Sequence, residues 1–305
     1  ANTASNTFAW TYDSTVPTLT SVSIASTNST STLVKHGEDV VLTFTASESI
    51  GTPVVTFLSG GAAITDTSIT YANTSGNNRN WTATYDVRYS DIEGAVTFSV
   101  AFSDTVGNAG TAVTAVTDGT SVIFDKTPPT ISEVTAITTP TNDNTPSYVF
   151  TTNEAGSITS SNTLTGDVTA EVNNNTITFA TLSDGTYESV TIIVTDATGN
   201  SSSALAVTTF VIDTTAPTFS TSPASVTVEC SASSEPSATG TALSGDSTAT
   251  VSYSDSTVDG TGNNSVITRV WTATDPAGNS TTYTQTITVV DTTAPTFTTS
   301  PASVT

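Results

Sequence analysis

Two short motifs that recur in step along the chain constrain its fold more than any other feature. Copies of the first, Asp-x-Thr-x-Pro-Thr, begin at Asp13, Asp125, Asp213 and Asp291. Copies of the second, Asp-x-x-Gly-Asn, begin at Asp104, Asp196 and Asp275. The intervals between the first motifs, about 80 to 110 residues, are each the size of one β-sandwich domain. Motifs repeated in phase at this period predict tandem domains of one kind.

The first motif also sets the expected domain boundaries, because its proline and turn residues suit a linker. The predicted domains are 18–124, 130–212 and 218–290, with linkers at 125–129 and 213–217.

Both ends of the chain are expected to belong to further domains. Residues 1–17 are predicted to hold the last strand of a preceding domain, at 7–13, and a linker. Residues 291–305 are predicted to hold a linker and the first strand of a following domain, because 296–305 nearly repeat 218–227. The sequence lacks Met and a charged-then-apolar leader, so we expect no signal peptide and a start that is not the native N-terminus.

Apolar and polar residues alternate along several segments, as they do in half-buried β-strands. The residues expected to point inward are Val40, Leu42, Phe44, Ala46, Trp81, Ala83, Tyr85, Val87, Val96, Phe98, Val100, Phe102, Val190, Ile192, Val194, Ile267, Trp271 and Ala273. Such strands, separated by turn residues, predict an all-β protein with one two-sheet β-sandwich in each interval, arranged end to end. Arg269 falls in the last inward row, and we expect its stem at a sandwich edge and its head in water.

The charge balance excludes several classes of partner. Five Lys and Arg residues stand against 27 Asp and Glu residues, a formal net charge of −22. Nucleic acids and anionic lipids both attract cationic proteins, so neither is an expected partner. No apolar run is long enough to span a membrane. Ser and Thr fill more than a third of the positions, as in a disordered mucin-like stalk, but the periodic apolar residues favour folded domains.

The inventory of reactive side chains argues against an enzyme. The chain has one histidine, His36, and one cysteine, Cys230, and they fall in different predicted domains. Neither a Cys/His or Ser/His/Asp catalytic site nor a Cys/His zinc site can be assembled from them. We expect His36 to be a solvated turn residue and Cys230 to be a small buried residue in a strand.

Three segments resemble known families of repeat domains. Segment 18–124 resembles a bacterial Ig-like domain of large surface proteins, through GEDVVLTFTASESIGTP, NWTATYDV and EGAVTFSVAFSDTVGNAG. Segment 130–212 resembles another bacterial Ig-like family, through TNDNTPSYVFTTNEAGSI and LSDGTYESVTIIVTDATGNSS. Segment 218–290 resembles a hyalin-type repeat, through SPASVTVEC and ITRVWTATDPAGNSTTYTQTITVVD. Hyalin-type repeats often carry a second cysteine where this chain has Ala277, so the resemblance implies an unpaired Cys230.

In an Ig-like sandwich the linker enters at the pole that also carries the Asp-x-x-Gly-Asn loop. Three acidic clusters are therefore predicted at three junctions. Their members are Asp13, Glu48 and Asp104; Asp125, Glu154 and Asp196; and Asp213 and Asp275, with Glu235 as a weaker candidate. Crowded carboxylates repel one another, and calcium, which accepts six to eight oxygen ligands, is the natural occupant.

The acids also have a purely structural interpretation. The aspartates can cap turn amides, and Asn108, Asn200 and Asn279 can either add oxygen ligands or serve the loop itself. Both interpretations, calcium binding and capping alone, stay open at this point.

The leading functional hypothesis is the shaft of a bacterial extracellular fibre or giant surface adhesin, secreted or held at the cell surface, with junctions stiffened by calcium. Its expected partners are neighbouring Ig-like repeats of the same chain, with a homo-oligomer or filament as a further option. One alternative is a spacer or carbohydrate-binding array of a secreted multidomain hydrolase, although Trp81 and Trp271 fall in inward rows and only Trp10 is unplaced. A second alternative is an S-layer-like lattice protein.

Overall fold

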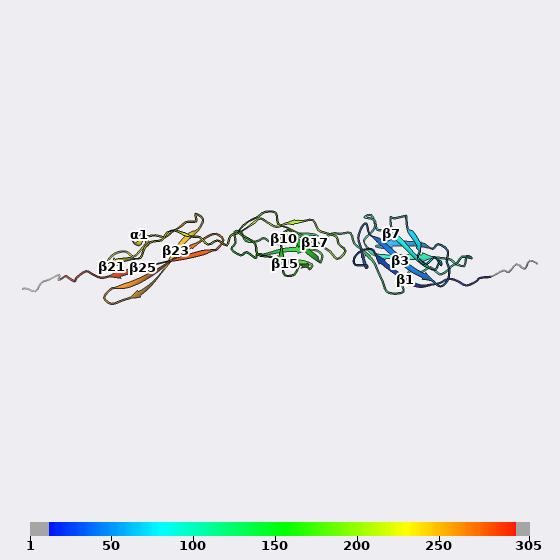
Figure 1. The fold of residues 1–305 in the computed structure, drawn as a ribbon, viewed down its shortest axis with the longest axis horizontal. Helices are drawn as coiled ribbons and strands as arrows, with labels where there is room; N and C mark the ends of the chain where they lie inside the picture. Colours follow the sequence, from blue (N-terminus) through cyan, green and yellow to red (C-terminus); the bar gives the residue numbers. More distant parts are fainter. Residues whose placement is uncertain (1–11, 297–305) are drawn as a thin grey trace, which may run out of the picture.

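The computed structural model describes residues 12–296, and the strand expected at 7–13, Trp10 and most of the strand expected after 291 lie outside this range. Three β-rich bodies follow one another along the chain and lie in a line (Figure 1). The described residues include a single four-residue helix, α1. Within residues 12–296 there is no helix that is long and apolar enough to cross a membrane.

The first domain is a two-sheet sandwich. Its strands are β1 (Leu19–Ser26), β2 (Leu33–Val34), β3 (Asp39–Ala46), β4 (Val54–Ser59), β5 (Ala62–Ala63), β6 (Thr70–Asn73), β7 (Asn80–Asp86), β8 (Gly94–Ala101) and β9 (Ile123–Phe124). One sheet has the order β1-β3-β7-β6 and the other β2-β9-β8-β4-β5. All pairs are antiparallel except β2 and β9, which run parallel. This mixture of long antiparallel strands and one short parallel pair encloses a single core.

The second domain repeats the sandwich with shorter strands. They are β10 (Ile131–Thr135), β11 (Ser147–Thr152), β12 (Gly156–Ser160), β13 (Leu164–Thr165), β14 (Thr169–Ala170), β15 (Asn173–Phe179), β16 (Gly185–Tyr187), β17 (Thr191–Thr195), β18 (Leu205–Ala206) and β19 (Phe210–Ile212). The sheet β10-β11-β15-β13 faces the sheet β14-β12-β17-β18, with the pair β16-β19 beside them. The core of this domain is separate from that of the first.

The third domain has one long sheet and a small second layer. Its elements are β20 (Phe219–Thr221), β21 (Val226–Glu229), α1 (Pro236–Thr239), β22 (Leu243–Ser244), β23 (Thr250–Asp259), β24 (Ser265–Thr274) and β25 (Ser280–Val290). The sheet order is β21-β25-β24-β23, and the second layer consists of the pair β20-β22 and α1. β23 and β24 form a hairpin with ten residues in each strand, and β23 is the edge strand of the sheet.

The alternation in the sequence accounts for the cores, since successive residues of a strand face opposite sides of a sheet. All the residues expected to point inward are buried, including Trp81 and Trp271. The prediction of an all-β chain of tandem Ig-like sandwiches is confirmed by this architecture.

The prediction for Arg269 is wrong, because its head does not reach water. Its side chain is 1% exposed and makes a bidentate ion pair with Asp255, with nitrogen to oxygen distances of 2.8 Å. The guanidinium also donates to Thr239 Oγ1 and to the Ser234 carbonyl. It lies over the ring of Tyr253, 4.6 Å from the centroid, so cation–π attraction adds to the ion pair.

The prediction that Cys230 is buried is also wrong, since the residue follows the last residue of β21 and is exposed. A strand that ends one residue earlier than the apolar pattern suggests leaves the thiol outside the core. His36 lies in the turn that precedes β3 and is exposed, as expected.

Candidate metal sites at the domain junctions

Each Asp-x-x-Gly-Asn loop is folded around its own aspartate. In the first domain, Oδ1 of Asp104 accepts hydrogen bonds from the amides of Val106, Gly107 and Asn108 at 2.7–2.9 Å. Gly107 has a φ of +105°, a conformation that favours glycine. Burial raises the pKa of Asp104, but the hydrogen bonds from Asn108, Val106 and Gly107 outweigh that effect and lower it. The motif therefore specifies a tight loop with an ionised aspartate at its centre.

The asparagine that ends each loop ties the loop to the linker that enters the domain. Its Nδ2 donates to Oδ2 of the loop aspartate and to the main-chain carbonyl of the linker aspartate. The carbonyl contacts are Asn108 to Asp13 at 3.1 Å, Asn200 to Asp125 at 3.2 Å and Asn279 to Asp213 at 2.7 Å. The asparagines thus act as donors that clamp loop to linker, and the same clamp is built three times.

The linker is also held from the upstream domain, by acids that sequence reasoning missed. Glu93 Oε1 accepts from the amide of Lys126 and the hydroxyl of Thr127, both at 2.7 Å. Asp184 accepts in the same way from the amide of Thr214 and the hydroxyls of Thr214 and Thr215. Each of these acids precedes a glycine, Gly94 or Gly185, and this shared dipeptide was the signal that could have identified them.

The upstream domain also contacts the downstream loop directly. At the second junction, Asn28 Nδ2 donates to the Thr198 carbonyl at 2.9 Å and Lys35 Nζ donates to the Gly199 carbonyl at 3.0 Å. At the third junction, the amide of Asn142 donates to the carbonyl of Ala277, which holds the same loop position as Thr198. The loop is therefore hydrogen-bonded both to its own linker and to the preceding domain.

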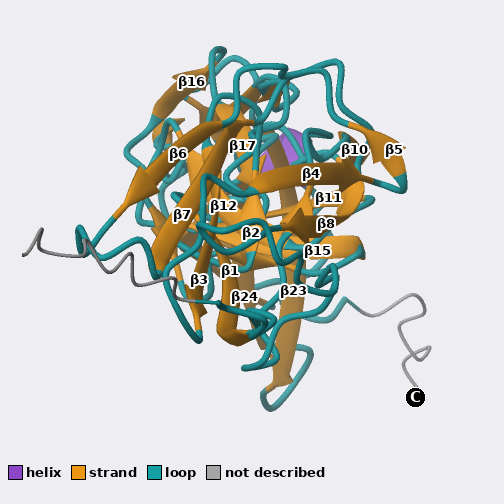
Figure 2. Cartoon of the chain, turned by 90° about the vertical axis from the view of Figure 1, so that its right-hand side faces the viewer, coloured by secondary structure: helices purple, strands orange, loops and turns teal. Residues whose placement is uncertain are grey.

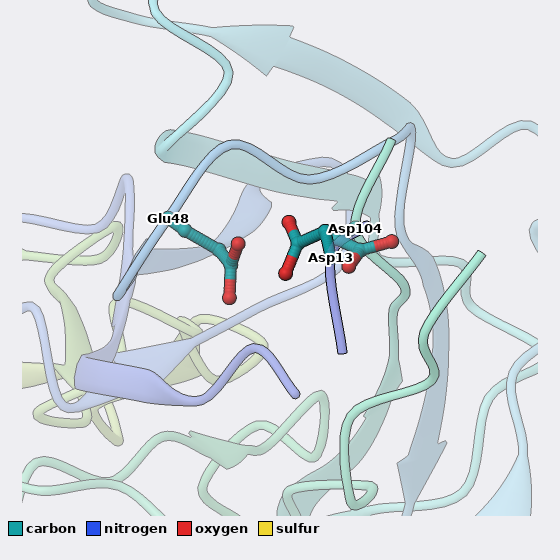
Figure 3. A group of neighbouring side chains, drawn as sticks. All are labelled: Asp13, Glu48 and Asp104. Carbon is teal, nitrogen blue, oxygen red and sulfur yellow. The ribbon is translucent and has the colours of Figure 1, made fainter. Parts of the chain in front are cut away.

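The structure brings the first predicted acidic cluster together at the entrance to the first domain. Asp13, Glu48 and Asp104 each offer a carboxylate oxygen, and these oxygens lie within 4.8 Å of one another. Figure 3 shows Glu48 pointing toward the two aspartates. Oε1 of Glu48 is buried and has no hydrogen-bond partner among the described residues. A buried carboxylate oxygen without a donor costs free energy unless something supplies the missing contact.

The second cluster, Asp125, Glu154 and Asp196, meets the same 4.8 Å limit. Burial raises the pKa of Asp125, and the charges of Asp196 and Glu93 raise it further. Burial and then the charges of Asp125, Asp196 and Glu93 raise the pKa of Glu154. Within residues 12–296 the only ion pairs are Arg88 with Asp66 and Asp86, and Arg269 with Asp255. These junction acids thus repel one another with no salt bridge to offset the repulsion.

The third junction differs from the other two. Asp275 and Asn279 form the loop and its clamp to Asp213, but Glu235 does not join them in a cluster of three acids. Glu235 lies directly before α1 and accepts a hydrogen bond from the hydroxyl of Tyr253. The amide of Gly245 donates to the Thr218 carbonyl as Ser47 and Asn153 donate to Thr18 and Thr130, so the position of Glu48 and Glu154 is held here by Asp246. Oδ1 of Asp246 accepts from the amide and hydroxyl of Thr248.

Capping and clustering occur together in the linker aspartates. Oδ1 of Asp13, Asp125 and Asp213 accepts from the amide two residues later, as in an Asx-turn. This leaves Oδ2 of Asp13 and Asp125 for the clusters, where Asp125 Oδ2 receives only a 3.4 Å contact from the Thr198 hydroxyl. Calcium prefers oxygen donors and accepts six to eight of them in loose geometry, so crowded carboxylates of this kind suit it. The residues at the first two junctions therefore fit a hard divalent cation.

Replacing Asn200 with alanine tests the clamp alone. The change removes two hydrogen bonds, to the Asp125 carbonyl and to Asp196, and is expected to destabilise the second domain by about 1–2 kcal/mol. The melting temperature of that domain should fall by about 4–8 °C for each kcal/mol lost, measured by differential scanning calorimetry. Asn174→Ala, at an exposed position in β15, is the matched control and should change little. Equal melting of both variants would contradict the clamp.

No protein-family model matches the chain, and no curated protein matches it in sequence. Among solved structures it is similar to the fibronectin(III)-like modules of Clostridium thermocellum CbhA, at 14% identity and a TM-score of 0.29, over 65% of this chain and 94% of that one. It is also similar to protocadherin gammaB7 EC3-6, at 15% identity and a TM-score of 0.27, over 85% of this chain and 72% of that one. A third similar structure holds the N-terminal eight Ig domains of Down Syndrome Cell Adhesion Molecule. The sequence identity is 9% and the TM-score 0.26, over 90% of this chain and 49% of that one. The fold assignment rests on the sheets described above, which make the chain a tandem array of immunoglobulin-like β-sandwiches.

Proposed function

We propose that this chain is a shaft segment of a bacterial extracellular fibre or large surface adhesin, and that its first two junctions bind calcium. The observation that supports this most is the repeated clamp, in which an asparagine of each loop holds the linker carbonyl. A chain whose task is to hold its ends apart needs fixed joints, and a clamp built at each joint supplies them.

The linkers limit the freedom of the joints further. Pro129 and Pro217 fix one backbone dihedral each and lack an amide hydrogen. The threonines before them are bound to Glu93 and Asp184, so little of the linker is free to swing. A short, anchored connection transmits force from one sandwich to the next, and each sandwich resists extension through its backbone hydrogen bonds. The proposed role is therefore mechanical.

Calcium would be held at the first junction by Asp13, Glu48 and Asp104, and at the second by Asp125, Glu154 and Asp196. The cation would supply positive charge among acids that otherwise repel. The protein's own groups do the rest: loop amides orient Asp104 and Asp196, and the linker turn orients Asp13 and Asp125. Bound calcium thereby joins linker, loop and domain at one point.

The alternatives receive less support. A carbohydrate-binding array usually presents aromatic rings on one face, but Trp81 and Trp271, the two tryptophans within residues 12–296, are buried. A lattice protein would share this fold and would need surfaces for lateral contacts between copies.

Isothermal titration with calcium tests the metal sites. We expect two sites per chain, one of which disappears in Glu48→Gln and the other in Glu154→Gln. Glu188→Gln, at an exposed acid, is the control and should keep both sites. Absence of binding, or binding that all three variants share, would reject calcium at the junctions. The shaft proposal would then rest on the clamps alone, which distances measured between neighbouring domains test separately.

A further inference from the structure

One sheet edge in the third domain is left open over an unusual length. β23 is the terminal strand of the sheet β21-β25-β24-β23 and has ten residues. It pairs with β24 from end to end without a register shift. Residues 252–264, which span most of β23 and the turn after it, are all exposed. In a view along the longest axis of the molecule, the long strand β23 runs outward from the other strands (Figure 2).

The free edge presents backbone groups at alternate residues. Gly260 donates its amide hydrogen to the Asn264 carbonyl at the tip of the hairpin. Antiparallel ladders alternate between hydrogen-bonded and non-hydrogen-bonded pairs, so the even-numbered residues of β23 bond to β24. The odd-numbered residues therefore point their amide and carbonyl groups away from the sheet. Within residues 12–296 these outward groups, at residues 251, 253, 255, 257 and 259, have no hydrogen-bond partner.

The other edges of the array are blunted, as is usual for sheets that avoid association. β5, β13, β14 and β18 are two residues long, and β6 and β21 are four. β1 and β10 are longer, but each has a register irregularity. β23 has none of these devices, and it contains no Pro, Lys or Arg. Half of its ten residues are Thr, Val or Tyr, which favour extended strands.

We propose that the open edge of β23 is a self-association surface, on which β23 of a second copy of this chain pairs antiparallel. A strand turned by a two-fold axis meets itself with donors opposite acceptors, and an axis at Ser254 or Ser256 satisfies four of the five outward residues. Strand-adding domains gain specificity from pockets for alternate side chains, whereas the middle of β23 presents the small residues Ser252, Ser254 and Ser256 on one face.

Local charge also permits this pairing. The strand has two acids, and the first, Asp255, is already neutralised by Arg269. Beside the edge, Val258 and Val266 are opposite each other on one face and are 68% and 40% exposed. A second strand laid along the edge would cover part of this apolar surface, which is otherwise in water.

The dependence on salt distinguishes a second copy from a basic partner. Two chains of net charge −22 repel each other, and dissolved salt screens that repulsion. Self-association should therefore strengthen as ionic strength rises, whereas binding of a basic protein would weaken. A single strand pair is small, so we expect association at high micromolar concentration rather than a tight dimer.

Sedimentation velocity of the full chain in chelator, at low and high salt, is the first test. We expect a concentration-dependent dimer that is favoured by salt. The variant Thr257→Val should retain the dimer, and Thr257→Pro should weaken its affinity at least ten-fold. The proline removes an outward amide without touching a bond to β24, and edge strands tolerate such a proline. A monomer at all concentrations, or a dimer unaffected by the proline, overturns the proposal.

Disulfide trapping tests the same contact in a chain with its native fold. In a Cys230→Ser background, single cysteines at Ser252, Ser254 and Ser256 lie at non-hydrogen-bonded positions of the proposed pair, where side chains are closest. One of the three should cross-link to itself far faster than the others, which fixes the register. Equal rates at all three, or no cross-link in conditions where sedimentation shows a dimer, would place the contact elsewhere.

Discussion

Replacing Asp255 with alanine is expected to unfold the third domain at a temperature about 15 °C or more below that of the natural chain. Asp255 is the ion-pair partner of Arg269, whose side chain is 1% exposed. The hydrogen bond to Asp255 raises the pKa of Arg269. Without Asp255 the guanidinium still stays charged, because arginine does not deprotonate in proteins. Removal of one partner of a buried ion pair costs about 3–5 kcal/mol.

Two further variants separate charge from packing. Asp255→Asn keeps an acceptor for Arg269 and should cost less than Asp255→Ala. The double variant Asp255→Thr with Arg269→Met removes both charges and should recover most of the stability, because apolar replacements of buried pairs are often neutral. Calorimetry resolves the domains, and the transitions of the first two should not move. A third-domain transition that Asp255→Ala lowers by less than a few degrees would show that Arg269 is not held by this pair.

Replacing Glu154 with glutamine is expected to change the stability of the second domain in opposite directions with and without calcium. In chelator, the variant removes a charge that Asp125, Asp196 and Glu93 repel, so melting should rise by roughly 2–5 °C. In calcium the natural chain gains stability from binding, about 2.7 kcal/mol at a hundred-fold excess over the dissociation constant. The variant should lose most of that gain.

The pH dependence of the second domain's stability, measured in chelator, tests the same repulsion independently. The pKa values of Glu154 and Asp125 in the folded chain lie above their ordinary values of 4.5 and 3.8. The folded state therefore holds these protons more tightly, and the contribution of the two groups is most favourable below their ordinary pKa values. It becomes unfavourable as pH rises through the raised pKa values.

Other carboxylates, such as Glu93, have lowered pKa values and run the other way, so the readout is the difference between the natural chain and Glu154→Gln. That difference should be small near pH 4 and grow toward pH 7. A constant difference would contradict the proposed repulsion.

Much of the fold could be predicted from the sequence, because a strand's side-chain period is fixed by its geometry. The rows Val40 to Ala46 in β3 and Trp81 to Val87 in β7 and after it are buried as their alternation indicates. The junctions could be located too, since the linker motif and the loop motif keep the same order in each interval. Both predictions depend on local pattern, which the sequence carries directly.

The contacts that could not be predicted join residues far apart in the sequence. Arg269 was expected to reach water because its row does not say that Asp255 on the neighbouring strand lies opposite it. Glu93 binds the linker 33 residues later, and Lys35 reaches a loop carbonyl 164 residues away. Glu235 was expected at the third junction, but the pairing of β20 with β22 places Asp246 in the position of Glu48.

Distances between spin labels in the first and second domains test the central claim, that the junctions hold neighbouring sandwiches in fixed positions. Labels at Thr56→Cys and Thr176→Cys, both exposed, in a Cys230→Ser background report this spacing by double electron–electron resonance. We expect one narrow distance distribution for the natural junction, narrower still in calcium, and a clearly broader one in Asn200→Ala. A broad distribution in the natural chain, in both chelator and calcium, would mean that the joints swing freely and would contradict the account.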